Sequence, residues 1–462
     1  MAMDPKRPQT SHQVAQGQFG SSNSMDRISE LEDGILGRIV SSLTLDEILN
    51  TRLLSRRWRS VWAYSTILNF RDEYRFSEEE LEPEREREIY VNFVNRVVEN
   101  HKGGNVEYFM AFFDLENDRS TNANVGRWLE FTERNRVQEV TLILLDDGKI
   151  LSDDGIFSGR MDLGYASSPH EFIANYNLKH ECNVVSDIPH PCKYGGFKFV
   201  KSISLSGVGT VGEAFKCLLD NCKFLEKVAL WGCGGFGNNV RVVGPALVLK
   251  YLEIQHCSIE SIEISPANLV SFTYDGDWIR LFLWNVPRLA EVSLAYHSRV
   301  STVAVFSKLL SCHPQLEVLT LNTCLIHQEN YTFPRLEILK HLEVKIATDE
   351  DCCLLQLASF IKASPELQKL VLELTGVVRP EHEIGIKEAA NCSHNSLRVV
   401  KVRDYRGRSG DLKLIMYLIE NAVKLEKIVV HPSHEGRPVD LAMRQLKRQI
   451  PEHINFVRAK NY

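Results

Sequence analysis

The chain has 462 residues, of which 60 are acidic and 54 are Lys or Arg, so its formal net charge is −6. This charge excludes the positive field of a dedicated DNA-binding protein, and 44% hydrophobic with 25% charged residues is typical of a globular protein. The length suits about three domains or one domain that grows by repetition.

No apolar run reaches the ~20 residues of a membrane helix, and the N-terminus lacks the apolar stretch of a secretory signal. We therefore expect a protein of the cytoplasm, the nucleus or both. The eleven cysteines are odd in number and scattered, which favours reduced thiols over a disulfide framework.

Residues 1–24 are rich in Gln, Ser, Gly and Pro and predict a disordered tail. Residues 25–72 then show helical periodicity, with a first apolar face formed by Leu31, Ile35, Leu36, Ile39 and Leu43. Ser29 with Glu32, and Thr44 with Glu47, have the spacing of capping boxes, which predicts the starts of two short helices.

A third short helix is predicted after Ser55, where Trp58, Val61 and Trp62 share one side. Three such helices form a small core and leave several large apolar side chains uncovered. This helical module is therefore expected to need a partner.

Residues 73–135 are predicted to hold an acidic linker and the first solenoid elements. The charge run Ser77–Glu88 reads as a solvated helix face or linker, and the apolar pattern resumes over Ile89–Val98. Residues 146–196 mix Gly, Asp, Ser, Pro and His and predict an irregular insertion.

A repeat dominates residues 136–390 and continues into the C-terminal segment. The spacing apolar-x-x-apolar-x-apolar recurs with starts at Val137, Val200, Leu225, Leu249, Leu269, Leu289, Leu316, Leu339, Leu367, Leu397 and Leu425. The steps from Val200 onward lie within or beside the roughly 20 to 29 residues of leucine-rich repeats. The prediction is an α/β fold, a curved solenoid with a parallel sheet on its concave face. Helices, as in Val303–Cys312 and Leu354–Ala363, are expected on its convex face.

Positions three, five and seven of each repeat are expected to line the concave face, because positions one, four and six point inward. The basic residues among them lie mostly downstream and favour an acidic partner surface, whereas the alternative is ordinary solvated strand positions. The candidate binding residues on this face are Trp231, Tyr251, Asp275, His341, Lys345, Lys369, Lys401, Arg403 and Lys427.

None of the other chemical motifs argues for an enzyme or predicts a cofactor. Gly232, Gly234 and Gly237 have dinucleotide-site spacing, but no amphipathic helix follows them, so a glycine-rich turn is predicted. Two His-x-Cys pairs could supply four zinc ligands, yet they lack the spacing of known fingers, and loop residues are the favoured interpretation. These pairs are His180 with Cys182 and His190 with Cys192.

Three cysteines fall at the ninth repeat position, where leucine-rich repeats place Asn or Cys to bond the turn backbone. They are Cys233, Cys257 and Cys324, and small buried groups are expected there.

The segment Asp26–Trp62 resembles an F-box, specifically the plant type that ends in Leu-Ser-x-x-Trp, here Leu54 to Trp58. The stretches Leu249–Gly276 and Asn395–Val430 resemble the plant F-box/leucine-rich-repeat/FBD family. The resemblance implies an F-box at 25–72 and an FBD-like segment at 391–462 that continues the solenoid.

The resemblance also implies a non-catalytic substrate-recognition subunit of an SCF-type cullin-RING ubiquitin ligase. In that family the F-box docks a Skp adaptor and the repeats bind the protein to be ubiquitylated. The adaptor-contacting positions would be Leu31, Ile35, Leu36, Ile39, Leu43, Leu53, Leu54, Trp58, Val61 and Trp62.

One departure from the family pattern is Leu31-Glu32, where the family usually has Leu-Pro. Loss of this Pro removes a rigid helix start and an adaptor contact, so adaptor affinity could be lower. This departure leaves open an interaction scaffold that works outside a ligase. A small-molecule-sensing F-box receptor is the other alternative, because the resemblance includes plant F-box solenoids that bind hormones.

Overall fold

A computed structural model provides the structure of the chain. It describes residues 28–43, 47, 50–51, 53–70, 83–114, 119–145, 150–152, 155–157, 198–206, 211–237, 239–244, 248–265, 268–296, 315–324, 335–347, 360–375, 393–433 and 437–459. The predicted tail at 1–24 lies outside these ranges, as does most of the predicted insertion.

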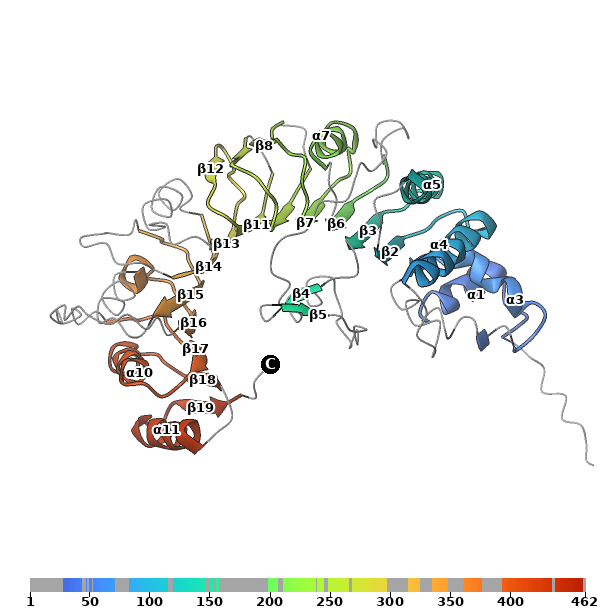
Figure 1. Cartoon of the computed structure of the whole chain (residues 1–462). Helices are drawn as coiled ribbons and strands as arrows, with labels where there is room; N and C mark the ends of the chain where they lie inside the picture. Colours follow the sequence, from blue (N-terminus) through green and yellow to red (C-terminus); the bar gives the residue numbers. More distant parts are fainter. Residues whose placement is uncertain are drawn as a thin grey trace, which may run out of the picture.

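Among the described residues the main sheet has fourteen strands, and every pairing within it is parallel. Figure 1 shows it as the inner lining of an arch. In spatial order the strands are β1 (Ile67–Asn69), β2 (Tyr108–Asp114), β3 (Glu139–Leu145), β6 (Ser202–Ser206), β7 (Lys227–Trp231), β9 (Tyr251–Gln255), β11 (Ser271–Gly276), β13 (Glu291–Tyr296), β14 (Val318–Cys324), β15 (His341–Ala347), β16 (Lys369–Thr375), β17 (Val399–Tyr405), β18 (Lys427–Pro432) and β19 (Asn455–Arg458).

The repeat prediction and the α/β solenoid are confirmed. Each of the eleven predicted starts is followed, two residues later, by the first residue of a strand. The fourth repeat position forms one continuous buried row because the strands are in register. From β3 to β18 this row is Val140, Ile203, Val228, Leu252, Phe272, Val292, Leu319, Leu342, Leu370, Val400 and Ile428.

The repeat spacing does not predict three strands of this sheet. Strand β1 lies inside the range predicted for the helical module, β2 lies in the predicted linker region, and β19 follows the last repeat. The sheet therefore extends beyond the region of regular leucine spacing at both ends.

Helices lie on the outer side of the arch toward both of its ends and, in the case of α7, near its crown (Figure 1). They are α4 (Pro83–Asn100), α5 (Arg119–Arg134), α7 (Val211–Asn221), α10 (Ser409–Asn421) and α11 (Arg437–Gln449). Of the two return helices predicted by range, Val303–Cys312 lies outside the described residues, and residues 360–363 of Leu354–Ala363 are helical.

The middle of the convex face differs from the prediction, because its return segments are strands. A parallel three-stranded sheet is formed by β8 (Asn239–Val242), β10 (Ser261–Ile264) and β12 (Arg280–Leu283). Repeats that start at Leu249 and Leu269 are shorter than the flanking ones. After the concave strand and two turns they leave too few residues for a helix of about three turns, whereas the short strands β10 and β12 fit. Strand β8 lies in the longer repeat that starts at Leu225, where it pairs with β10.

The helical module, defined here as residues 28–66, contains α1 (Asp33–Val40), α3 (Trp58–Val61) and the 3₁₀ turn η1 (Trp62–Tyr64). The predicted capping box is wrong: α1 begins at Asp33, its N-cap is Glu32, and the Glu32 side chain makes no capping hydrogen bond. The second predicted helix falls mostly on residues outside the described ranges.

Two further features complete the described fold. Strands β4 (Ile150–Ser152) and β5 (Gly155–Phe157) form an antiparallel pair within the sequence range of the predicted insertion. No helix of the described ranges combines the length and the apolar character that crossing a membrane requires.

Acid is expected to destabilise the C-terminal part of the solenoid through His394. This side chain is 5% exposed, its Nε2 lies 3.1 Å from the Tyr417 hydroxyl, and burial lowers its pKa to about 4. In the unfolded chain the His394 imidazole takes up a proton near pH 6.5, whereas in the folded chain it stays neutral until the pH approaches 4. The free energy of unfolding is therefore highest above pH 6.5 and falls as the pH drops toward 4.

Between pH 7 and pH 5 the free energy of unfolding is expected to fall by on the order of 1–2 kcal/mol. It can be measured by hydrogen exchange of peptides from 393–421 at both pH values. His394→Gln removes the titrating group, so its loss over the same interval should be smaller. An equal loss in both proteins would contradict this assignment.

Candidate functional site

The helical module has a small hydrophobic core of its own. Leu36, Val40, Trp58 and Val61 are each at most 4% exposed and pack together, separately from the main solenoid core. Helix α1 approaches η1 so closely that a Cβ at Gly37 would collide with the Tyr64 backbone. Three of the ten predicted adaptor-contacting residues, Leu36, Trp58 and Val61, are therefore inside the module and hold its helices together.

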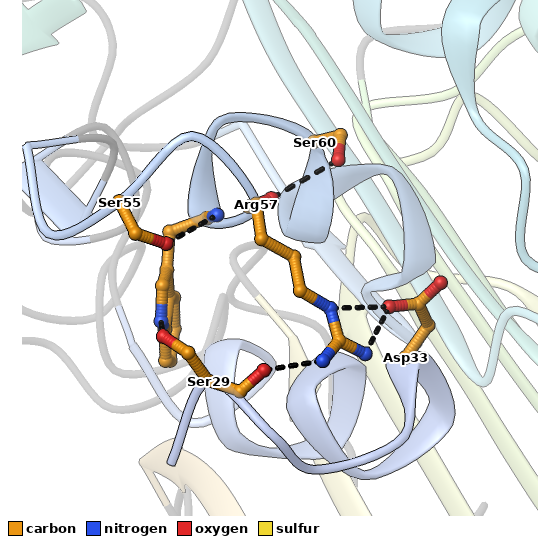
Figure 2. A network of polar contacts seen from close by, with 6 residues as sticks. Ser29, Asp33, Ser55, Arg57 and Ser60 are labelled. Carbon is orange, nitrogen blue, oxygen red and sulfur yellow. Dashed lines mark hydrogen bonds and ion pairs between the residues drawn. The ribbon is translucent and has the colours of Figure 1, made fainter. Parts of the chain in front are cut away.

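A polar network fixes α3 against the segment before α1 (Figure 2). The Trp58 Nε1 donates to Ser29 Oγ at 2.9 Å, and the Trp58 backbone N–H donates to Ser55 Oγ at 3.4 Å. The Arg57 guanidinium bonds to Asp33 Oδ1, at 2.8 Å from Nη2, and to the Ser29 carbonyl. Ser29 thus accepts from Trp58 in place of the capping role predicted for it.

The other predicted positions remain at the surface of the module. Leu53 is 87% exposed and Leu54 is 66% exposed, while Ile35 and Ile39 lie on the outer side of α1 with 47% and 39% exposed. Leu31, Leu43 and Trp62 are half-buried against the small core. Ile28, 56% exposed, adds an apolar group that the sequence analysis did not name, although it stands three residues before Leu31.

The module is joined to the solenoid around η1. Trp62 packs against both hydrophobic cores, and the Ala63 carbonyl accepts hydrogen bonds from the backbone N–H groups of Lys102 and Gly103. His101 Nε2 lies 2.9 Å from the Ser65 carbonyl. These contacts anchor one side of the module and leave Leu53 and Leu54 uncovered.

The concave face shows the predicted alternation of buried and accessible side chains. On β9, Tyr251, Glu253 and Gln255 are accessible while Leu252 and Ile254 are buried. Upstream, Trp231 packs edge-on against His256 with ring centroids 5.5 Å apart, and Asp275 on β11 is half-buried. This part of the face is mainly aromatic and polar.

The downstream part of the concave face is basic, as expected, but two of its cations are paired. Lys345 Nζ lies 2.8 Å from Glu373 Oε1, and Arg403 forms an ion pair with Glu343. Lys369, Lys401 and Lys427 are half-buried and make no hydrogen bond or ion pair with the described residues. Burial lowers the pKa of His341, helped by the charges of Lys369, Lys401 and Arg403.

The cysteine prediction is confirmed for two residues. Cys233 and Cys257 are buried, the Cys233 N–H donates to Cys257 Sγ at 3.3 Å, and the Cys257 thiol donates to the Gln255 carbonyl at 3.2 Å. Burial raises the pKa of the Cys257 thiol, which disfavours the reactive thiolate. The Cys324 side chain lies outside the described set.

The glycine motif is a turn, as predicted. Gly232 and Gly237 have φ of 56° and 61°, and strand β8 follows them where a dinucleotide site requires a helix. The two His-x-Cys pairs at 180–192 lie outside the described residues. Within the described part of the chain, no group of three or more His, Cys, Asp or Glu side chains is placed to hold a metal ion.

Comparisons with known proteins place this architecture in a family. A model of the "At1g61320/AtMIF1, LRR domain" matches residues 97–449, and a model of the "F-box domain" matches residues 28–69. Similar proteins from Arabidopsis thaliana include "F-box/FBD/LRR-repeat protein At1g13570", 24% identical over 91% of this chain and 94% of its own length.

Two more Arabidopsis thaliana relatives show similar coverage. "F-box/FBD/LRR-repeat protein At3g14710" is 21% identical over 89% of both chains. "FBD-associated F-box protein At1g61320" is 22% identical over 88% of this chain and 89% of its own. Because the repeat-domain model spans well over half of its residues, the chain belongs to the plant F-box/leucine-rich-repeat family.

Proposed function

We propose that the chain is a substrate-recognition subunit of an SCF-type cullin-RING ubiquitin ligase. The observation that carries this proposal is the uncovered apolar surface of the F-box, formed by Ile28, Ile35, Ile39, Leu53 and Leu54. These side chains are exposed and lie outside the buried core of the module, so they are available to a partner. The family supports a Skp adaptor as that partner.

The mechanism would be proximity. The F-box would dock the adaptor, and through it the cullin-RING ligase, while the concave face holds a client protein near the ubiquitin carrier. Bond making would belong to the partner enzymes, so the chain itself would be a non-catalytic adaptor. A complex of this kind would work in the cytoplasm or the nucleus.

Binding of the purified full chain to a plant Skp adaptor tests the proposal directly, and titration calorimetry measures it. We expect a 1:1 complex with micromolar or tighter affinity. Absence of binding at micromolar concentrations would remove the ligase assignment and leave the scaffold that works outside a ligase.

Restoring the family Pro by Glu32→Pro should stabilise the module and should not weaken adaptor binding. Glu32 has φ −62°, which suits Pro, and its side chain makes no capping bond that would be lost. Because Pro reduces the conformational entropy of the unfolded chain, the substitution is expected to raise the free energy of unfolding by up to ~1 kcal/mol. Hydrogen exchange of residues 28–43 checks the stability, and calorimetry checks the affinity.

The Glu32→Pro result also separates two functions. A gain in adaptor affinity would show that this position tunes a ligase contact. An unchanged affinity would weaken the argument for the scaffold, which rests on Glu32 alone.

A small-molecule sensor is the second candidate, and one pocket favours it. A cavity of about 340 Å³ lies beside the starts of the β16 and β17 repeats, within the roughly 300–1,000 Å³ typical of ligand sites. Its polar lining includes Lys362, Ser364, Ser393 and Asn395. Native mass spectrometry of protein purified from its source tissue would reveal a bound mass, and an unliganded mass would count against this function.

A further inference from the structure

The register of the strands places basic residues of the concave face in one row. Across β14 to β19 this row contains Val318, His341, Lys369, Val399, Lys427 and Asn455. It has three basic side chains and no acidic one. Lys401 stands two residues further along β17, diagonally between Lys369 and Lys427.

The acidic residues nearest to the lysines of this row are already engaged, and Glu291, which continues the row on β13, lies three strands away from Lys369. Glu343 pairs with Arg403, and Glu373 pairs with Lys345. Lys369, Lys401 and Lys427, called the lysine triangle below, therefore keep their charge without a counterion among the described residues. Like charges on neighbouring strands repel one another, and a bound anion would relieve this cost.

His341 supports the same location. Its Nε2 is buried and has no hydrogen-bond partner among the described residues, although buried polar atoms are nearly always paired. His341 stands directly opposite Lys369 in the register. The Nε2 atom is shielded from solvent as placed, so the imidazole has to turn before a ligand that lies along this row can satisfy it.

The spacing of the lysine triangle selects the form of the anion. Neighbouring strands lie about 4.8 Å apart and two residues along a strand cover about 6.6 Å, so diagonal neighbours are about 8 Å apart. In an extended peptide, alternate side chains on one face are about 7 Å apart. Lys369 and Lys427 are two strands apart, about 9.6 Å, so three carboxylates in line would not match all three lysines. Two carboxylates at alternate positions do fit Lys401 together with Lys369 or Lys427, because flexible lysine side chains bridge the small difference.

We propose that the lysine triangle is the receptor for an extended acidic segment, with Asp or Glu at alternate positions, of a protein bound on the concave face. The inference rests on the proposed function only in taking that protein to be the client. The aromatic and polar surface upstream, around Trp231, then contacts other parts of the same protein.

Fluorescence anisotropy with the purified full chain tests the receptor. The probe is a fluorescein-labelled peptide, Gly-Glu-Gly-Glu-Gly-Glu-Gly, and its Gln counterpart is the neutral control. We expect the Glu peptide to bind, the Gln peptide not to bind, and affinity to fall as salt screens the charges. Failure of the Glu peptide to bind at millimolar concentration would overturn the proposal.

Matched variants locate the binding. Lys401→Gln should lower the affinity for the Glu peptide about fivefold. The triple change Lys369→Gln, Lys401→Gln and Lys427→Gln should lower it at least about 20-fold. Lys401→Arg keeps the charge and should retain binding. Lys227→Gln, on β7 at the repeat position that Lys369 and Lys427 occupy in their own repeats, should leave affinity unchanged, and an equal loss there would contradict a local site.

Two further outcomes are informative. If inorganic tripolyphosphate binds at the lysine triangle while the Glu peptide does not, the site takes a free polyanion and the peptide proposal fails. Because no Skp adaptor is present in these assays, failure of adaptor binding leaves the peptide result intact. The two proposals can therefore fail separately.

Discussion

Trp58→Ala is expected to unfold the F-box module while the solenoid keeps its structure. Trp58 is 4% exposed and is the largest of the four buried core residues within the described part of the module. Removing a buried Trp costs about 3–5 kcal/mol. The change also removes the Nε1 hydrogen bond to Ser29. A helical module of this size has little stability in reserve, so the loss should exceed it.

Hydrogen exchange with mass spectrometry can separate the two parts of the chain. Peptides from 28–62 should lose protection, whereas peptides from β7 to β13 should keep it, because the cores are separate except at Trp62. Trp284→Ala is the matched control, since Trp284 is 52% exposed on the solenoid. Retained protection in 28–62, or loss throughout the solenoid, would contradict an independent core.

The repeats of the solenoid could be predicted because their signal is local. Each unit carries its own leucine spacing and period-two alternation, so β9 can be located without knowing what lies beside it. The strands of the convex face were not predicted, since the choice between helix and strand there depends on the length left over in each repeat. The sequence of a short run such as Ser261–Ile264 is compatible with either a helix or a strand.

The helical module shows where sequence reasoning reaches its limit. Ile35 and Leu36 both belong to the apolar stripe of α1, yet Leu36 is buried and Ile35 is 47% exposed. The stripe is wider than the surface that α3 and η1 cover, and only tertiary packing decides which part stays open. Ser29 likewise fits a capping pattern, but its hydroxyl accepts from Trp58, 29 residues away in the sequence.

The charges of the concave face were predictable in part. Lys345 and Glu373 stand opposite each other on adjacent strands, so the repeat register alone places them together. Arg403 pairs with Glu343 across an intervening strand, and this contact depends on side-chain reach that a spacing rule cannot supply. The lysine triangle could not be predicted, because the sequence does not show that Glu343 and Glu373 are engaged by other cations.

Leu53→Asp is expected to abolish adaptor binding without disturbing the fold. Leu53 is 87% exposed and belongs to neither hydrophobic core, so the substitution costs little stability. In a complex, the new carboxylate would be desolvated in an apolar contact with no counterion. We expect affinity for the Skp adaptor to fall at least about 100-fold, a loss of ~3 kcal/mol.

Calorimetry with the full chain measures this loss, and hydrogen exchange of 28–62 confirms that the module remains folded. Val423→Asp is the matched control, because Val423 is 71% exposed on the part of the solenoid far from the F-box. The chain with this substitution should bind the adaptor with unchanged affinity. Ile35→Asp, on the outer side of α1, should reproduce the loss if both residues share one interface. Undiminished binding by both F-box variants would place the adaptor elsewhere, since a carboxylate cannot be buried there without cost.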